Sequence, residues 1–181
     1  LVARLSNPFP GATELFGNAV AVSGNTVVVG APQDNTYNTL GGAAFAFRAD
    51  TGQFLFALLV PTRGANDKIG AAVAIDGNVI AVGAPVDDGT AADTGAVHLF
   101  DATTGAFLRT IANPSPQTGD QFGASVALDG NLLVVGAPGD DTHGTGAGTA
   151  WTFNVSTGAQ LKTRFDIVGA AGELFGAAVA I

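Results

Sequence analysis

The stretch "DGNVIAVGAPVDDG", residues 76–89, occurs in three nearly identical copies in this chain of 181 residues. The other copies are "SGNTVVVGAPQDNT" at 23–36 and "DGNLLVVGAPGDDT" at 129–142, so consecutive copies start 53 residues apart. Self-similarity at a fixed period is the sequence signature of repeat architectures. The chain is therefore expected to fold as a series of equivalent structural units.

Several unrelated sequence markers keep the same period. A large apolar residue followed by Gly recurs four times, and a Gly-Ala-Pro triplet recurs three times. These positions are Phe16, Gly17, Gly30, Ala31, Pro32, Ile69, Gly70, Gly83, Ala84, Pro85, Phe122, Gly123, Gly136, Ala137, Pro138, Phe175 and Gly176. The complete repeats are approximately 16–68, 69–121 and 122–174, with partial repeats at 1–15 and 175–181.

One period predicts four short strands, and the second repeat shows them most clearly. The turn Asp76-Gly77-Asn78 is expected because Gly tolerates positive φ and Asp hydrogen-bonds to its own backbone. The apolar run "VIAVGA" is typical of a strand that is buried on both faces, and Pro85 ends it. The predicted strands of this repeat are 70–75, 79–84, 95–100 and 106–111.

Four antiparallel strands in a period of about 50 residues are the arithmetic of a β-propeller blade. We predict an all-β fold, with residues 1–181 forming part of one β-propeller domain of about three blades. Residues 1–8 align with the fourth strand of a preceding period, and 175–181 with one further first strand. Because three blades do not normally close a ring, we expect further sequence on both sides or closure by other copies of the chain. Glycines near the motifs are expected where neighbouring backbones approach closely.

Composition limits the classes of partner. The chain has 15 acidic and 7 basic residues, for a formal charge of −8, and no cysteine. Such a surface repels phosphate backbones, so nucleic acid is not expected as a partner, whereas cations and basic partners fit it. Every apolar run is shorter than the roughly 20 residues that span a bilayer, so membrane insertion is not expected.

The Phe-Gly and Gly-Ala-Pro spacing, with a Thr-Gly turn and an aromatic residue ending the third strand, resembles the FG-GAP repeat. The aromatic residues and turns are Phe47, Thr51-Gly52, Phe100, Thr104-Gly105, Phe153 and Thr157-Gly158. This repeat is best known from the propeller of integrin alpha chains and is widespread in bacterial surface and secreted proteins. The resemblance covers essentially the whole chain and implies a β-propeller with an extracellular or cell-surface recognition role, on a secreted bacterial protein. It names no ligand.

The chain departs from the integrin-like pattern at one point. There, the link between the first two strands of a blade carries a calcium loop of DxDxDG type. Here the link is only Ser23-Gly24-Asn25, Asp76-Gly77-Asn78 or Asp129-Gly130-Asn131, and one or two oxygens cannot supply the 6–8 ligands that calcium prefers. The chain therefore resembles a bacterial short-loop variant, and the family's calcium sites are not carried over.

An acidic or amide pair follows each Gly-Ala-Pro triplet and is the main candidate for a binding site. A calcium ion or a basic partner is one interpretation of these oxygen-rich loops. The other, which we favour, is that the side chains cap turns, because structural needs recur in every repeat. The candidate binding residues are Asp34, Asn35, Tyr37, Asp87, Asp88, Asp93, Asp140 and Asp141, and the candidate calcium ligands are Asp87, Asp88, Asp140 and Asp141.

Other polar residues are expected to be structural. A second periodic acid precedes each large apolar-Gly pair, at Glu14, Asp67, Asp120 and Glu173, where we expect it to fix the entry loop of the first strand. His98 aligns with Phe45 and Trp151, which predicts a large-residue position in the third strand. His143 lies in a Gly/Thr-rich loop, and the two histidines match no zinc motif.

The sequence thus favours a non-enzymatic extracellular interaction or adhesion propeller that binds a protein or glycan through loops on one face. No catalytic residues are assigned, because no nucleophile elbow or carboxylate pair is recognisable. A structural subunit of a surface scaffold, sheath or filament is the alternative, with further copies of the chain as partners. A second alternative is a propeller accessory to an enzyme elsewhere in a longer chain. Calcium is the one cofactor considered.

Overall fold

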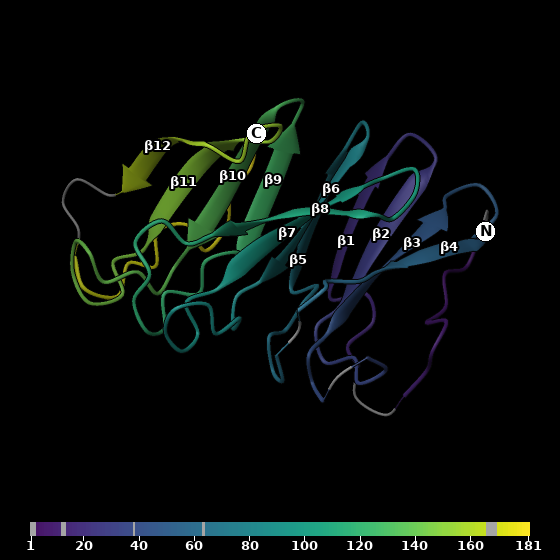
Figure 1. Ribbon diagram of the computed structural model, residues 1–181, viewed down its shortest axis with the longest axis horizontal. Helices are drawn as coiled ribbons and strands as arrows, with labels where there is room; N and C mark the ends of the chain where they lie inside the picture. The colour runs from purple at the N-terminus through teal and green to yellow at the C-terminus, as the bar shows by residue number, and fades with distance from the viewer. Residues whose placement is uncertain (1–2, 12–13, 38, 63, 166–169) are drawn as a thin grey trace.

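The chain forms three four-stranded antiparallel sheets (Figure 1). The computed structural model describes residues 3–11, 14–37, 39–62, 64–165 and 170–181, with the main chain alone for 163–165. Within these ranges no helix is present, in agreement with the predicted all-β class. In every sheet the strands neighbour one another in chain order.

Each repeat folds as one sheet, and we call the sheets blades 1, 2 and 3. Blade 1 contains β1 (Ala19–Ser23), β2 (Thr26–Ala31), β3 (Ala43–Arg48) and β4 (Phe54–Leu58). Blade 2 contains β5 (Ala72–Asp76), β6 (Val79–Ala84), β7 (Ala96–Asp101) and β8 (Phe107–Ala112). Blade 3 contains β9 (Ser125–Asp129), β10 (Leu132–Ala137), β11 (Thr149–Asn154) and β12 (Gln160–Phe165). The predicted strands of the second repeat are confirmed to within two residues at each end.

The hairpin between the first two strands of a blade has the predicted two-residue turn. In blade 2, Asp76 pairs with Val79 across the turn, and Gly77 has a φ of 51°. Glycine adopts this left-handed conformation without the steric cost that a Cβ would bring. The Oδ2 atom of Asp76 also accepts a hydrogen bond of 2.7 Å from the Gly130 N–H, in the corresponding turn of blade 3. This turn of blade 2 is therefore bonded to the corresponding turn of blade 3.

The hydrophobic core lies between neighbouring blades. Val28 and Leu58 of blade 1 pack in one cluster with Ile80, Val82 and Phe100 of blade 2, and none of the five is more than 1 % exposed. A second cluster joins blades 2 and 3 in the same way. Because the middle strands are covered on both faces, each blade depends on its neighbour for burial, as expected for stacked repeats.

Glycines bring the backbones of neighbouring blades into contact. A Cβ on Gly30 would overlap the carbonyl oxygen of Gly70, and a Cβ on Gly83 would overlap that of Gly123. The same glycines connect strands within a blade, since the Gly70 N–H donates to the Gly83 carbonyl at 3.0 Å. The interpretation of these glycines as close-approach positions is confirmed.

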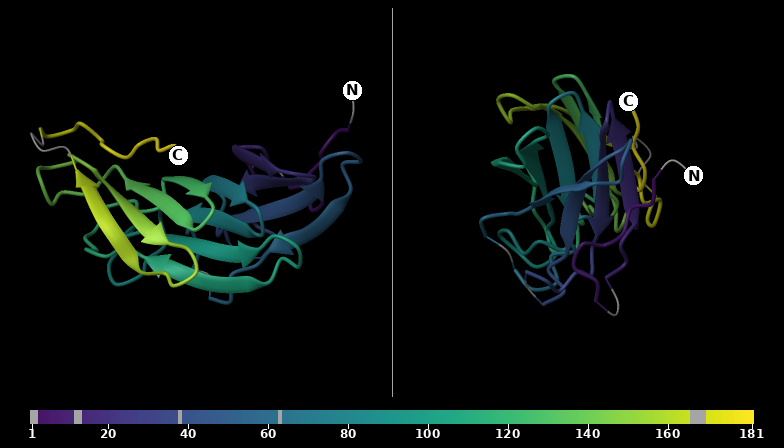
Figure 2. Two further views of the ribbon diagram at one scale, coloured as in Figure 1. Left: turned by 90° about the horizontal axis from the view of Figure 1, so that it is seen from above. Right: turned by 90° about the vertical axis from the view of Figure 1, so that its right-hand side faces the viewer.

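The three blades follow one another in an open arc, seen from above in Figure 2. β5 lies beside both β1 and β9, so the first strands of the repeats are adjacent. Of the partial repeat at 175–181, Phe175 forms one parallel bridge with Gly148, and the described part of 1–8 forms no ladder; residues 1–2 lie outside the described residues.

Candidate functional site

Two kinds of loop meet at one end of the blades, which we call the loop face. The exit loops, 32–42, 85–95 and 138–148, lead from the second strand to the third. The link segments, 59–71 and 113–124, lead from one blade to the next. These long loops gather at the lower edge of Figure 1, opposite the short hairpins.

The first member of each acidic or amide pair accepts a backbone hydrogen bond from two residues further on. The bonds join Asp34 Oδ1 to the Thr36 N–H (2.8 Å), Asp87 Oδ1 to the Gly89 N–H (3.1 Å) and Asp140 Oδ1 to the Thr142 N–H (2.9 Å). Such bonds are typical of Asx turns. The first residue of the pair therefore shapes the start of the exit loop in every repeat.

The second member of each pair accepts a backbone hydrogen bond from five residues further on. The bonds join Asn35 Oδ1 to the Leu40 N–H (2.7 Å), Asp88 Oδ1 to the Asp93 N–H (3.0 Å) and Asp141 Oδ1 to the Gly146 N–H (2.6 Å). Leu40, Asp93 and Gly146 all have positive φ, between 51° and 61°. The pair thus folds each exit loop, which is the turn-capping role that the sequence favoured.

Tyr37, one of the candidate binding residues, packs against the aromatic side chains beside blade 1. It is half-buried, and its ring lies edge-on to Phe9 at 5.9 Å between centroids. Phe9 also contacts Phe45, at 6.1 Å, and Phe54, at 6.1 Å. Tyr37 is held in this position because four aromatic side chains fill the space beside blade 1.

The second periodic acid fixes the link segments, as predicted. Asp67 Oδ2 accepts from the Gly64 N–H (2.5 Å), Asp120 Oδ2 from the Gln117 N–H (2.7 Å) and Glu173 Oε2 from the Ala170 N–H (3.0 Å). In each of these repeats the donor lies three residues earlier. Glu14 instead accepts a hydrogen bond from the Asn7 side chain.

Asp120 organises the link segment between blades 2 and 3. Its Oδ2 atom also accepts a 2.7 Å hydrogen bond from the Asn113 amide, and Asn113 Oδ1 in turn accepts one of 3.0 Å from the Ser115 N–H. Asp120 and Asn113 are both buried. The segment that carries Pro114 and Ser115 is therefore held by a buried polar network.

Burial leaves several carboxylates in an unfavourable environment. Among the described residues, Asp34 Oδ2, Asp120 Oδ1 and Asp140 Oδ2 are buried and have no hydrogen-bond partner. Burial raises the pKa of the Asp120 carboxyl, and the negative charges of Asp140 and Asp141 raise it further. A raised pKa means that the folded protein holds this carboxyl's proton more tightly than an exposed aspartate would.

In blade 2, carboxylates also lie close together, around a cavity of about 400 Å³ on the loop face. The cavity is lined by Thr62, Gly64, Asp67, Asp87, Asp88 and Gly89. Burial raises the pKa values of Asp67 and Asp87, and Asp88 adds to both shifts. Across the described ranges, no group of three or more His, Asp or Glu side chains has an arrangement that could hold a metal ion.

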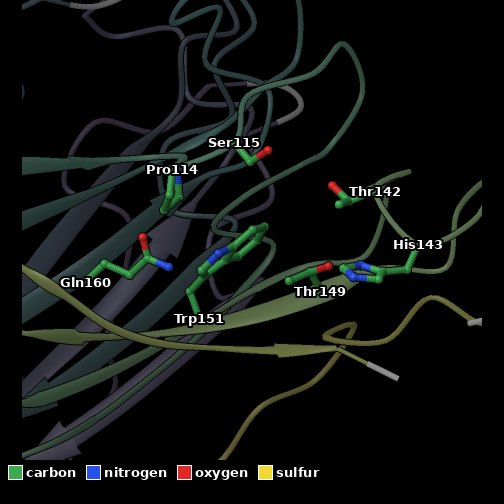
Figure 3. Close-up of a pocket in the computed structure, with 7 residues that line it drawn as sticks. All are labelled: Pro114, Ser115, Thr142, His143, Thr149, Trp151 and Gln160. Atoms are coloured by element: carbon green, nitrogen blue, oxygen red, sulfur yellow. The ribbon is translucent and has the colours of Figure 1, made fainter. Parts of the chain in front are cut away.

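A second cavity, of about 300 Å³, lies where the link segment to blade 3 meets that blade (Figure 3). The link segment contributes two residues, the exit loop two, β11 two and β12 one. They are Pro114, Ser115, Thr142, His143, Thr149, Trp151 and Gln160. In Figure 3 the Trp151 indole lies at the centre of this group, and the Gln160 side chain extends toward it.

Trp151 is fixed in place by aromatic packing. It is 3 % exposed, and its ring meets Phe122 at 5.5 Å between centroids with the planes inclined by 62°. Phe122 in turn packs edge-on against Phe153, at 5.8 Å. Edge-to-face pairs of this kind orient buried rings. The indole is therefore a rigid part of the cavity.

His98 occupies the equivalent position in blade 2, as the sequence predicts. It is 2 % exposed, its Nδ1 lies 3.0 Å from Thr110 Oγ1, and its Nε2 lies 3.7 Å from Asp87 Oδ2. Burial lowers the pKa of His98 to about 4, so the ring is neutral at neutral pH. His98 therefore replaces an aromatic core residue.

Sequence reasoning did not find the cavity beside Trp151, and it left His143 in a loop without a role. A signal was present in the repeat itself. At the positions of Trp151 and Gln160, blade 1 has Phe45 and Phe54 and blade 2 has His98 and Phe107. The side chains at these two positions change from repeat to repeat while the surrounding motif stays the same, and this variation could have indicated where the blades differ in their surface.

The comparison with protein families agrees with this architecture. The FG-GAP repeat matches residues 2–47, 61–100 and 111–153. The chain belongs to the FG-GAP repeat family. In this FG-GAP protein, the glycine of each Gly-Ala-Pro triplet meets the backbone of the glycine in the Ile-Gly or Phe-Gly pair of the next repeat. No curated protein sequence matches the chain.

Two solved structures with a similar fold are computationally designed proteins. The computationally designed Ika4 protein is 21 % identical, with a TM-score of 0.61 over 93 % of this chain and 81 % of that chain. The computationally designed Ika8 protein is 22 % identical, with a TM-score of 0.57 over 90 % of this chain, which spans 39 % of Ika8. At this identity the likeness shows the fold alone. No helix in the described residues is long and apolar enough to cross a membrane.

Proposed function

We propose that this FG-GAP protein is a non-enzymatic recognition module, secreted or displayed at a cell surface, that binds a protein or glycan through its loop face. Membership of the FG-GAP repeat family supports the extracellular setting and the absence of catalysis. The same fold hosts unrelated functions, so the proposal rests on the site itself.

The observation that carries the proposal is the position of the cavities. The acidic cavity beside blade 2 and the Trp151 cavity beside blade 3 both lie where an exit loop meets a link segment. Loops held by a rigid scaffold are the usual place for binding residues. Turn-capping carboxylates such as Asp88 and Asp141 fix these loops and thereby preorganise the face, which lowers the entropy that a partner must overcome.

The experiment compares charge insertions on the two ends of the blades. Thr90→Arg and Thr142→Arg place a cation on the loop face, and Gln53→Arg and Ala159→Arg place the same charge in hairpin turns at the opposite end. Each labelled protein is applied to a printed array of glycans and purified matrix proteins. We expect the loop-face variants to lose the wild-type signals and the hairpin variants to keep them. Equal loss in both sets, or a wild-type array without signals, would overturn the proposal.

One observation favours the scaffold as a second candidate. Val20 and Val22 of β1 are 59 % and 63 % exposed. Their equivalents in blade 2, Val73 and Ile75, pack into the core between blades 1 and 2. Blade 1 therefore presents an apolar face that an equivalent blade of a second copy would cover. Analytical ultracentrifugation tests this candidate, since Val22→Lys should dissociate any assembly that the wild-type chain forms.

A further inference from the structure

We propose that the cavity beside Trp151 is a binding site for one ring of a neutral carbohydrate. This inference rests on the proposed recognition function and names the ligand class of one site on the loop face. It is carried by three independent features, which are the rigid construction of the cavity, the aromatic rings that pack at the equivalent position beside blade 1, and the chemistry of the lining.

The polar lining of the cavity is preorganised. Thr149, on β11, is 1 % exposed, and its hydroxyl donates to Asp140 Oδ1 at 3.1 Å. The Ser115 backbone is held through Asn113 to Asp120. Asp140 itself also accepts from the N–H of Thr142. Side chains held in this way lose little entropy when a ligand is bound, which favours weakly interacting ligands such as sugars.

Blade 1 shows what the same position looks like when the chain fills it. Ser115, His143, Trp151 and Gln160 correspond, two periods earlier, to Phe9, Tyr37, Phe45 and Phe54. In blade 1, Phe9 contacts the other three rings at 5.9, 6.1 and 6.1 Å, and its aromatic cluster occupies the space. In blade 3, smaller polar side chains replace three of the four rings and a cavity of about 300 Å³ results. The cavity therefore arises from substitutions at the lining and leaves the frame of the blade unchanged.

The lining matches an uncharged ligand rich in hydroxyl groups. None of the described lining residues is Asp, Glu, Lys or Arg, although the chain as a whole carries a charge of −8. Hydroxyl, amide and imidazole groups both donate and accept hydrogen bonds, as sugar hydroxyls do. The exposed groups of this kind belong to Ser115, Thr142, His143 and Gln160, whereas the buried Thr149 hydroxyl donates to Asp140. Pro114, which is exposed, supplies apolar surface for the C–H groups of a sugar ring, and the indole of Trp151 borders the cavity with only 3 % of its surface exposed.

Size argues for a single ring. A volume of about 300 Å³ lies at the lower limit of small-molecule sites. A stable protein partner covers roughly 800 Å² on each side of an interface, far more than this cavity offers. A basic peptide would instead favour the acidic cavity beside blade 2, which three carboxylates line. We therefore assign the neutral cavity to a carbohydrate.

The only tryptophan of the chain lies in the cavity and makes the test direct. Trp151 fluorescence is recorded while methyl glycosides of hexoses, N-acetylhexosamines and deoxyhexoses are added to the intact 181-residue chain. We expect a saturable spectral change for at least one glycoside, with a midpoint in about the millimolar range that suits a ligand of this size.

Two variants provide the comparison. The triple variant Ser115→Phe, His143→Tyr, Gln160→Phe copies the blade 1 lining, and we expect it to weaken binding at least tenfold with an unchanged circular dichroism spectrum. Thr62→Phe makes the corresponding change at the acidic cavity of blade 2 and should leave the titration unaltered. If the triple variant fails to fold, Gln160→Phe alone replaces it, with the same expected direction.

The outcomes separate this inference from the proposed function. A fluorescence change that the triple variant retains, or no saturable change with any glycoside, would overturn the carbohydrate assignment. If array signals for matrix proteins are still lost in the Thr90→Arg and Thr142→Arg variants, the loop face remains a recognition surface that binds by other means. If both the titration and the array are silent, both proposals fail.

Discussion

Blades 1 and 3 have the same frame and opposite contents at the loop face. Beside blade 1, the rings of Phe9, Tyr37, Phe45 and Phe54 pack together, and Phe9 contacts the other three. Beside blade 3, the equivalent positions surround Trp151 with polar side chains and leave a cavity. The comparison teaches that this fold separates two tasks, because backbone motifs hold the blades together and a few side chains decide whether a space opens.

The largest expected effect comes from substituting the glycines at which the backbones of neighbouring repeats are in contact. Gly30→Ala in blade 1 and Gly136→Ala in blade 3 would each place a Cβ on a carbonyl oxygen of the next repeat. We expect both to lower the free energy of unfolding by about 3 kcal/mol, measured by urea titration. Gly77→Ala is the control, because it meets open space at a φ of 51° and should cost only about 1 kcal/mol. Different losses at Gly30 and Gly136 would show that the frames are not equivalent.

Removing aromatic side chains beside blade 1 tests whether its aromatic cluster contributes to stability. Phe45 is fully buried, so Phe45→Ala should cost about 3 kcal/mol, as other large-to-small core substitutions do. Phe54→Gln copies the residue found at Gln160, and we expect a smaller loss of about 1 kcal/mol because Phe54 is 37 % exposed. Thermal melting measures both. A loss for Phe45→Ala no larger than that for Phe54→Gln would contradict the cluster's role in stability.

Blade 2 offers an intermediate case with a pH signature. The pKa of His98 falls from 6.5 in the unfolded chain to about 4 in the fold because of burial. Its contribution is complete above pH 6.5 and is lost as the pH falls toward 4, which amounts to about 2 kcal/mol at pH 4.5. His98→Phe, which copies Phe45, should remove this acid sensitivity. Urea titrations at pH 7 and 4.5 measure the free energy of unfolding of both proteins. If the variant lost as much stability at pH 4.5 as the wild type, His98 would not be the cause of the acid sensitivity.

The link segment beside the Trp151 cavity can be tested through Asp120. Its raised pKa means that stability is present below the unfolded value and declines as the pH rises through the folded value. At pH 7 we expect Asp120→Asn to stabilise the fold by up to about 1 kcal/mol, since the amide still accepts from Gln117. Asp120→Ala, which accepts nothing, should destabilise it. A loss in both variants would show that the charge itself is needed.

Calcium removal is expected to have the smallest effect. Asp87, Asp88, Asp140 and Asp141 each already accept a backbone hydrogen bond within their exit loop. We therefore expect EDTA to leave the melting temperature unchanged in the wild type. A decrease that added calcium reverses, and that Asp88→Asn abolishes, would instead establish these loops as cation sites.

The frame could be predicted from sequence because its causes are local. Gly77 needs positive φ, Pro85 ends a ladder, and the pair at Asp87 and Asp88 follows the chemistry of turns, so spacing alone located them. The Trp151 cavity could not be predicted in this way. Its walls come from a link segment, an exit loop and two strands. Its volume depends on which side chains meet at these positions, since the equivalent positions beside blade 1 hold rings in contact, such as Phe9 and Phe45.

The backbone contact between Gly83 and Gly123 has a mechanical consequence. A spacing set by main-chain atoms in contact is the same for every pair of blades, whatever side chains line the loop face. The distance and angle between neighbouring blades, and hence the curvature of the arc, therefore do not depend on the side chains that line the cavities. A blade of this kind can be exchanged for another, or duplicated, without changing the geometry in which its neighbours present their exit loops.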